Sequence, residues 1–141
     1  MTLPPLRGFL PLLALVPLAG CMQDSASYTF PEKNHAISLI RTQAWPWQDS
    51  MELGISVVRQ PDCDGGLQLK DVPLKAELSL FKAPDDYAEP IFILRVDKRD
   101  YAISMDSCRV QAFREPPPDV GVKLGAFKEK DGKFSFVAEG N

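Results

Sequence analysis

Three cysteines are the residues of this chain whose side chains offer the widest choice of chemistry. They are Cys21, Cys63 and Cys108, in a sequence of 141 residues. A cysteine can form a disulfide, hold a metal ion or accept a covalent modification. A zinc site is disfavoured, because the chain has one histidine, His35, and no Cys-x-x-Cys spacing. The sequence therefore predicts no bound metal, and modification or disulfide formation is left for the three thiols.

The first cysteine follows a segment with the features of a secretory signal peptide. Residues 1–20 carry one charge, Arg7, and then an uncharged apolar stretch from 8 to 19. A basic start, a short apolar stretch and small residues before the cleavage point are typical of such leaders. The apolar stretch is too short for a membrane-spanning helix, which needs about 20 residues. We therefore expect residues 1–20 to be removed.

The residues Leu18-Ala19-Gly20-Cys21 resemble the lipobox of bacterial lipoproteins. In that class the cysteine thiol receives diacylglycerol, the leader is cut off and the new amino terminus is acylated, for example by palmitate. The resemblance implies a lipid-anchored protein of the cell envelope. Met22 replaces the aspartate that favours inner-membrane retention in enterobacterial lipoproteins, so it further implies the outer membrane, facing the periplasm. A plain secretion signal with an incidental cysteine and a retained membrane anchor are the alternatives.

With Cys21 assigned to lipid, Cys63 and Cys108 are left as a pair in an oxidising compartment. Disulfide formation is the default there, and two free buried thiols are the alternative. The disulfide would close a loop of about 45 residues, which the chain-entropy model values at about 4 kcal/mol.

Composition predicts one small domain that does not bind nucleic acid. Residues 1–20 contain one basic and no acidic residue, so their removal changes the net charge from −3 to −4. A mildly acidic surface lacks the basic stripe that nucleic-acid binding needs. We expect a flexible lipidated tether over 21–34, where the sequence is polar with few aliphatic residues, and a single domain over 35–141.

The residues after His35 form short, turn-separated segments of β type. In 51–59, Leu53, Ile55 and Val57 alternate with more polar residues, as in a strand with one buried face. The segment 90–96 is apolar on both faces and predicts a central strand, and the next two segments should extend it as a meander. The expected strands lie at 36–42, 51–59, 73–82, 90–96, 100–106 and 107–113.

The last predicted unit is a β-hairpin. Asp131-Gly132 suits a two-residue type I′ turn, because both central positions need positive φ. This register places Phe127 opposite Phe136, Ala126 opposite Val137, and Lys130 opposite Lys133. The predicted fold is an all-β antiparallel barrel or sandwich of seven to nine strands with one disulfide. A short helix at 84–89 is an additional expectation.

Sequence motifs for catalysis are missing, so we expect no enzymatic activity and no cofactor. There is no Gly-x-Ser-x-Gly and no phosphate-binding glycine loop, and the one histidine lies near the tether. The segment 61–66 ("PDCDGG") departs from a calcium loop, which needs further acids and a glutamate at position 12. We interpret it as a tight turn in which Gly65 and Gly66 adopt positive φ.

Trp45 and Trp47 flank a proline and are the candidate partner-binding residues. Tryptophan is enriched in binding hot spots, but in a small β domain it more often fills the open end of the core. The sequence favours the core position, and exposure of both rings on one side would reverse that preference.

These features predict a lipid-anchored, non-catalytic envelope protein whose β domain binds another envelope protein. A carrier of a small apolar ligand inside a lipocalin-type barrel is the alternative. An inhibitor of a wall-degrading enzyme is a weaker one, because it rests on architecture alone.

Overall fold

The computed structural model describes residues 2–3, 22–31 and 34–140. The lipobox-type motif at 18–21, with Cys21 and nearly all of the predicted leader, lies outside the described residues. Within them, no helix is long and apolar enough to cross a membrane.

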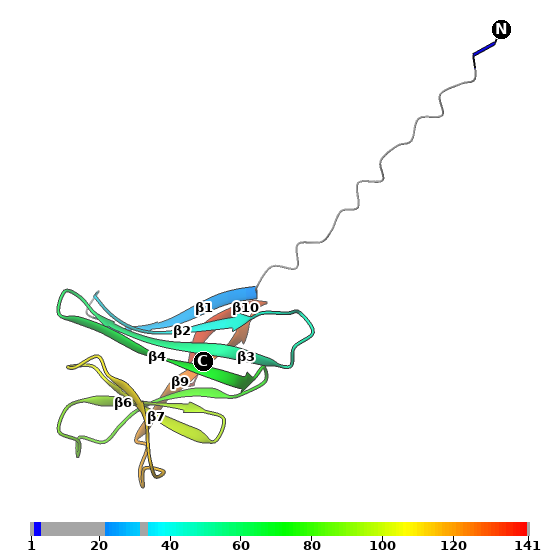
Figure 1. The fold of residues 1–141 in the computed structure, drawn as a ribbon. Helices are drawn as coiled ribbons and strands as arrows, with labels where there is room; N and C mark the ends of the chain where they lie inside the picture. The colour runs from blue at the N-terminus through cyan, green and yellow to red at the C-terminus, as the bar shows by residue number, and fades with distance from the viewer. Residues whose placement is uncertain (1, 4–21, 32–33, 141) are drawn as a thin grey trace.

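The described chain consists of ten strands in two antiparallel sheets, which confirms an all-β fold with more strands than the seven to nine expected (Figure 1). The first sheet has the order β1-β2-β3-β4 and the second the order β10-β9-β5-β6-β7-β8. The strands are β1 Met22–Thr29, β2 His35–Gln43, β3 Ser50–Arg59, β4 Cys63–Pro73, β5 Leu78–Lys82, β6 Ile91–Val96, β7 Arg99–Ser104, β8 Val110–Ala112, β9 Val122–Lys130 and β10 Lys133–Ala138.

The expectation of a flexible tether over 21–34 is wrong for Met22–Thr29. These residues form β1, which pairs with β2 along its whole length, from Met22 opposite Gln43 to Thr29 opposite Ala36. The side-chain hydroxyls of Ser27 and Ser38 hydrogen-bond across the pair. The segment looks like a linker in sequence because β1 is an edge strand with most of its side chains in water.

The second sheet contains the two units that the sequence defines best. Strands β6, β7 and β8 form the expected meander, and β6 lies inside the sheet with both faces covered. The C-terminal hairpin of β9 and β10 has the expected register, with Phe127 opposite Phe136. Asp131 and Gly132 have φ values of 53° and 76°, as a type I′ turn requires.

The two sheets share one hydrophobic core. Inward side chains of β2 and β3 pack with those of β5, β6 and β7, while β1 lies next to β10 (Figure 1). Among its largest fully buried side chains are Ile37, Leu39, Leu53, Ile55, Leu80, Leu94 and Ile103. The alternation that predicts a half-buried β3 is thus confirmed, because Leu53, Ile55 and Val57 all belong to the core.

Two local expectations are wrong. Residues 84–89 form turns and bends instead of a short helix. The turn near Cys63 comprises residues 60–62, whereas Gly65 and Gly66 lie inside β4 without positive φ. Gly65 is required for a different reason, because a Cβ atom there would lie 1.9 Å from the carbonyl oxygen of Cys108.

Candidate functional site

Trp45 and Trp47 are both exposed, so the expectation that they fill the core is wrong. They lie in the loop between β2 and β3, with 49% and 75% of their surfaces accessible. Their ring centroids are 5.4 Å apart and their planes are inclined by 18°, so the two indoles stack on each other. The stacked pair therefore forms an exposed apolar surface on this loop.

The loop that carries the tryptophans is held by hydrogen bonds at its base. The side-chain amide of Gln43 donates to the carbonyl oxygen of Gln48 at 2.7 Å. The backbone N–H of Gln48 donates to the carbonyl oxygen of Trp45 at 3.2 Å. A six-residue loop with Pro46 at its centre is thereby closed at both sides, which presents the stacked pair in a defined position.

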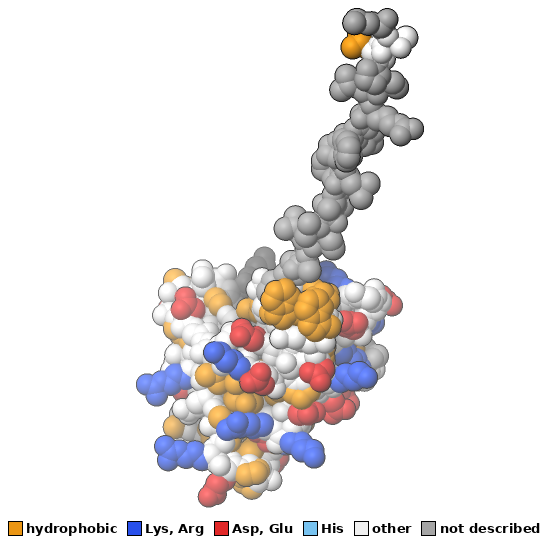
Figure 2. All heavy atoms as spheres, turned by 45° about the vertical axis from the view of Figure 1, so that its right-hand side comes forward, with side chains coloured by type: hydrophobic (Ala, Val, Ile, Leu, Met, Phe, Trp, Pro, Cys, Tyr) orange, Lys and Arg blue, Asp and Glu red, His pale blue; other side chains and the backbone are white. Residues whose placement is uncertain are grey.

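Two further exposed apolar residues lie at the same end of the first sheet. Met22, the first residue of β1, is opposite Gln43 and is 58% exposed. Leu74 follows β4, donates its backbone N–H to the carbonyl oxygen of Asp49, and is 37% exposed. We call this region the tryptophan end; it comprises Met22, residues 44–49 and Leu74. Figure 2 turns it towards the viewer and shows hydrophobic side chains at the surface with acidic side chains below them.

An open groove of about 590 Å³ adjoins the tryptophan end. It runs between β1 and β2 of the first sheet and β9 of the second. Its lining mixes thioether and aliphatic side chains with amides and charged groups. The lining residues are Met22, Gln23, Asp24, Arg41, Gln43, Met51, Leu74 and Glu129.

Arg41 organises the charged side of this groove. Its Nε donates to Asp24 Oδ1 at 2.7 Å, and its Nη2 lies 3.4 Å from Glu129 Oε1. The guanidinium also lies over the ring of Phe134, 3.8 Å from the centroid. The hydrogen bond to Asp24 and the charge of Glu129 raise the pKa of Arg41, although partial burial opposes the shift. The guanidinium therefore joins the two sheets as a permanent cation.

The side chains at this end are suited to binding. Indole and thioether groups supply apolar contact area, the exposed amide of Gln23 offers hydrogen bonds, and Arg41 is already paired with carboxylates. Within the described residues, no three His, Cys, Asp or Glu side chains gather closely enough to hold a metal ion. His35 begins β2 at the opposite end, with its ring 6.3 Å from that of Phe30.

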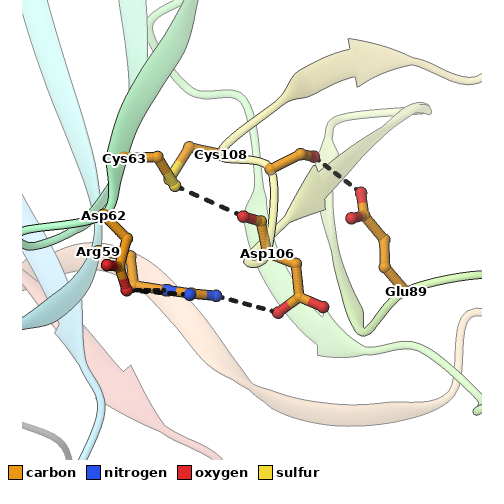
Figure 3. The surroundings of a disulfide bond; sticks show 7 residues. Arg59, Asp62, Cys63, Glu89, Asp106 and Cys108 are labelled. Carbon is orange, nitrogen blue, oxygen red and sulfur yellow. Dashed lines mark hydrogen bonds and ion pairs between the residues drawn. A yellow bond between two sulfur atoms is a disulfide. The ribbon is translucent and has the colours of Figure 1, made fainter.

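The opposite end of the first sheet contains the predicted disulfide. Cys63 and Cys108 are bonded, with their Cα atoms 5.9 Å apart, and the bond joins β4 to the segment before β8 (Figure 3). Arg59 lies beside it and donates to Asp62 at 3.0 Å and to Asp106 at 3.1 Å. We call Arg59–Cys63 with residues 106–108 the disulfide end. It joins the two sheets by one covalent bond and a charged bridge.

Sequence reasoning found the tryptophans and missed the rest of their surroundings. Met22 and Asp24 fall in the segment that the sequence predicts to be a tether, and Arg41 has no pattern that singles it out from other surface arginines. Alternating Leu67, Gln68, Leu69 and Lys70 is the signal that could have revealed β4, which ends beside the tryptophan loop.

No protein-family model matches the chain, and neither the curated proteins nor the solved structures include a match to it.

Proposed function

We propose that the chain is a lipid-anchored, non-catalytic protein of the bacterial cell envelope, attached to the outer membrane and facing the periplasm. In this proposal its β domain binds another envelope protein at the groove beside the tryptophan end. The observation that carries the proposal is the open groove of mixed apolar, amide and charged lining, which adjoins a hydrogen-bonded loop with exposed indoles. The lipobox-type sequence ending at Cys21 supports the anchor.

The exposed pair supports binding because large apolar rings in water are costly unless another surface covers them. Both indoles are held by a hydrogen-bonded loop, so little conformational freedom would be lost on contact. The adjoining groove adds amide and charged groups that give such a contact direction. A partner segment with apolar side chains and hydrogen-bonding groups fits this combination.

The apolar-ligand carrier has less support because its ligand needs an internal cavity. Inward side chains of both sheets instead pack against each other in a contiguous cluster. The groove at the tryptophan end is open and partly charged. Two sheets around a filled core support a sandwich more than a lipocalin-type barrel.

The anchor is tested by the substitution Cys21→Ser. We expect this variant to lose its acyl mass and to move from the membrane fraction to the soluble periplasmic fraction, as measured by intact mass and fractionation. A Ser25→Ala variant serves as the control, because it changes an exposed residue of β1 without touching the lipobox or the disulfide. An acyl mass that persists in Cys21→Ser, or its absence from the unsubstituted protein, would contradict the anchor.

Partner binding is tested by site-specific photocrosslinking in intact cells. A photoreactive residue at Gln23, which is exposed and lines the groove, should give one discrete protein adduct. The matched control is Asp64, which is also exposed but lies at the other end of the sheet. No protein adduct from Gln23, or the same adduct from both positions, would contradict the proposed site. A stoichiometric apolar ligand in lipid extracts of the purified protein would favour the carrier.

A further inference from the structure

We infer that the tryptophan end rests directly on the lipid bilayer, with the indoles of Trp45 and Trp47 in its interfacial region. This inference rests on the proposed lipid anchor at Cys21. It adds a second contact with the membrane, made by the folded domain itself, and an orientation of the domain. The indoles then contact lipid, and the groove lined by Gln23, Arg41 and Glu129 is left for the protein partner.

In the mature chain that this anchor implies, described strand structure begins directly after the lipidated residue. A 14-residue tether would let the domain move up to about 45 to 50 Å from the membrane, at about 3.3 to 3.6 Å per extended residue. Strand β1 instead begins at Met22, the residue that follows Cys21 in the sequence, and is paired from that residue onward. A lipid group on Cys21 would therefore be attached one residue from folded structure, and the start of β1 has to lie at the bilayer surface.

Exposed apolar side chains gather at the end of the sheet where β1 starts. Met22 is opposite Gln43, and Trp45 and Trp47 follow Gln43 in the same turn of chain. Figure 1 shows the start of β1 and the β2–β3 loop at the same end of the sheet. Of the six large hydrophobic residues exposed among the described residues, four belong to the tryptophan end; the other two are Leu3, in the predicted leader, and Val122.

The side chains of the tryptophan end suit the interfacial region of a bilayer. Indole rings favour the interface of a bilayer, because the ring is apolar while its N–H stays hydrated. The loop 44–49 contains no Lys or Arg and ends in the exposed Asp49. Attraction to anionic headgroups therefore contributes little, and contact should be apolar, insensitive to salt and independent of anionic lipid.

The test uses the emission of the tryptophans, because Trp45 and Trp47 are the only two in the chain. The full-length protein is purified from membranes and reconstituted into phosphatidylcholine vesicles that contain a lipid with a nitroxide quencher near its headgroup. We expect at least about a twofold loss of emission relative to vesicles without the quencher, and protection from iodide in the water. Neither value should change between low and high salt.

A matched control moves the reporter to the other exposed apolar position. The variant Trp45→Phe/Trp47→Phe/Val122→Trp keeps the anchor and places a single indole at the start of β9, at the far end of that strand from Glu129. We expect its emission to remain open to iodide and to be unaffected by the lipid quencher.

Intact mass separates the two ways in which the idea can fail. If Cys21 carries no acyl mass, the proposed anchor and this inference are both wrong. If the acylated protein stays on the vesicles while its tryptophans remain open to iodide and unquenched by lipid, only this inference is wrong. Protection from iodide in native membranes without quenching by lipid would show that a protein covers the tryptophans instead.

Discussion

The two ends of the first sheet differ in what holds their residues and in how much apolar surface they expose. At the disulfide end, a covalent bond and the Arg59 bridge hold β4 to the segment before β8, and the charged groups there are paired. At the tryptophan end, the loop is closed by its own hydrogen bonds and its largest side chains face water. The disulfide end therefore serves the stability of the domain, whereas the tryptophan end keeps apolar surface available for contact.

This division predicts which substitutions change stability and which change contact. Changes at the disulfide end should lower the free energy of unfolding without changing what the tryptophans touch. Changes at the tryptophan loop should leave stability almost unaffected, because both rings are largely in water in the isolated domain.

The largest loss of stability is expected from removing the disulfide. Cys63→Ser/Cys108→Ser should lower the free energy of unfolding by about 4 kcal/mol, because the unfolded chain regains the freedom of a 45-residue loop. Urea unfolding followed by far-ultraviolet circular dichroism measures this change. A midpoint equal to that of the unmodified chain would show that the disulfide end is not the stabilising end.

Gly65→Ala should cost about 2 to 3 kcal/mol, because the added methyl group overlaps the Cys108 carbonyl oxygen and the disulfide prevents that segment from moving away. The same substitution in the Cys63→Ser/Cys108→Ser background should cost less, since the segment can then shift. A double-mutant cycle measures the difference. Equal costs in both backgrounds would contradict the explanation.

Arg41→Met should cost about 1 kcal/mol, since it removes the pairing with Asp24 and Glu129 and the contact with the Phe134 ring. Methionine keeps much of the apolar stem. Arg59→Met at the disulfide end is the matched control and should cost about 0.5 kcal/mol, because it removes exposed ion pairs like those of Arg41 but no contact of the kind that Arg41 makes with Phe134, and the disulfide remains. Thermal unfolding compares the two variants. A larger loss of stability in Arg59→Met than in Arg41→Met would contradict the stabilising role given to Arg41.

The smallest effect concerns acid. Hydrogen bonds from Ser104 and Ser107 lower the pKa of Glu89 below its ordinary value of 4.5, and the charge of Arg109 adds to the shift. A lowered pKa in the folded state means that the ionised form stabilises the fold above the unfolded pKa, and that this contribution is lost as the pH falls through the folded value. Glu89→Gln should therefore flatten the stability curve below pH 4.5 and leave its slope at neutral pH unchanged. A steeper acid loss in the variant would contradict the assignment.

Strong local patterns made the second sheet predictable from sequence. The Asp131-Gly132 turn fixes the register of its hairpin, and the continuous apolar segment of β6 can only be central. Both edge strands of the first sheet escaped prediction, because β1 and β4 expose most of their side chains and read as linker or loop. Pairing with β2 and β3, the neighbouring strands in sequence, makes them strands, and their own exposed residues give only a weak apolar pattern.

The candidate site was predictable only in part for the same reason. Trp45 and Trp47 stand out by type, but whether they plug the core or face water depends on how the β2–β3 loop closes on Gln43 and Gln48. The role of Met22 depends on β1 being a strand. Neither condition leaves a local trace in the sequence.

The account is tested most directly by amide hydrogen exchange on the lipidated protein in vesicles, compared with the Cys21→Ser variant in solution. We predict slower exchange at the backbone N–H groups of residues 22–23 and of the non-proline residues in 44–49 when the protein is membrane-bound. We predict no change at the N–H groups of residues 60 and 62 at the disulfide end. Equal exchange at 44–49 in the two forms, or new protection confined to 60–62, would contradict a domain that meets its surroundings through the tryptophan end.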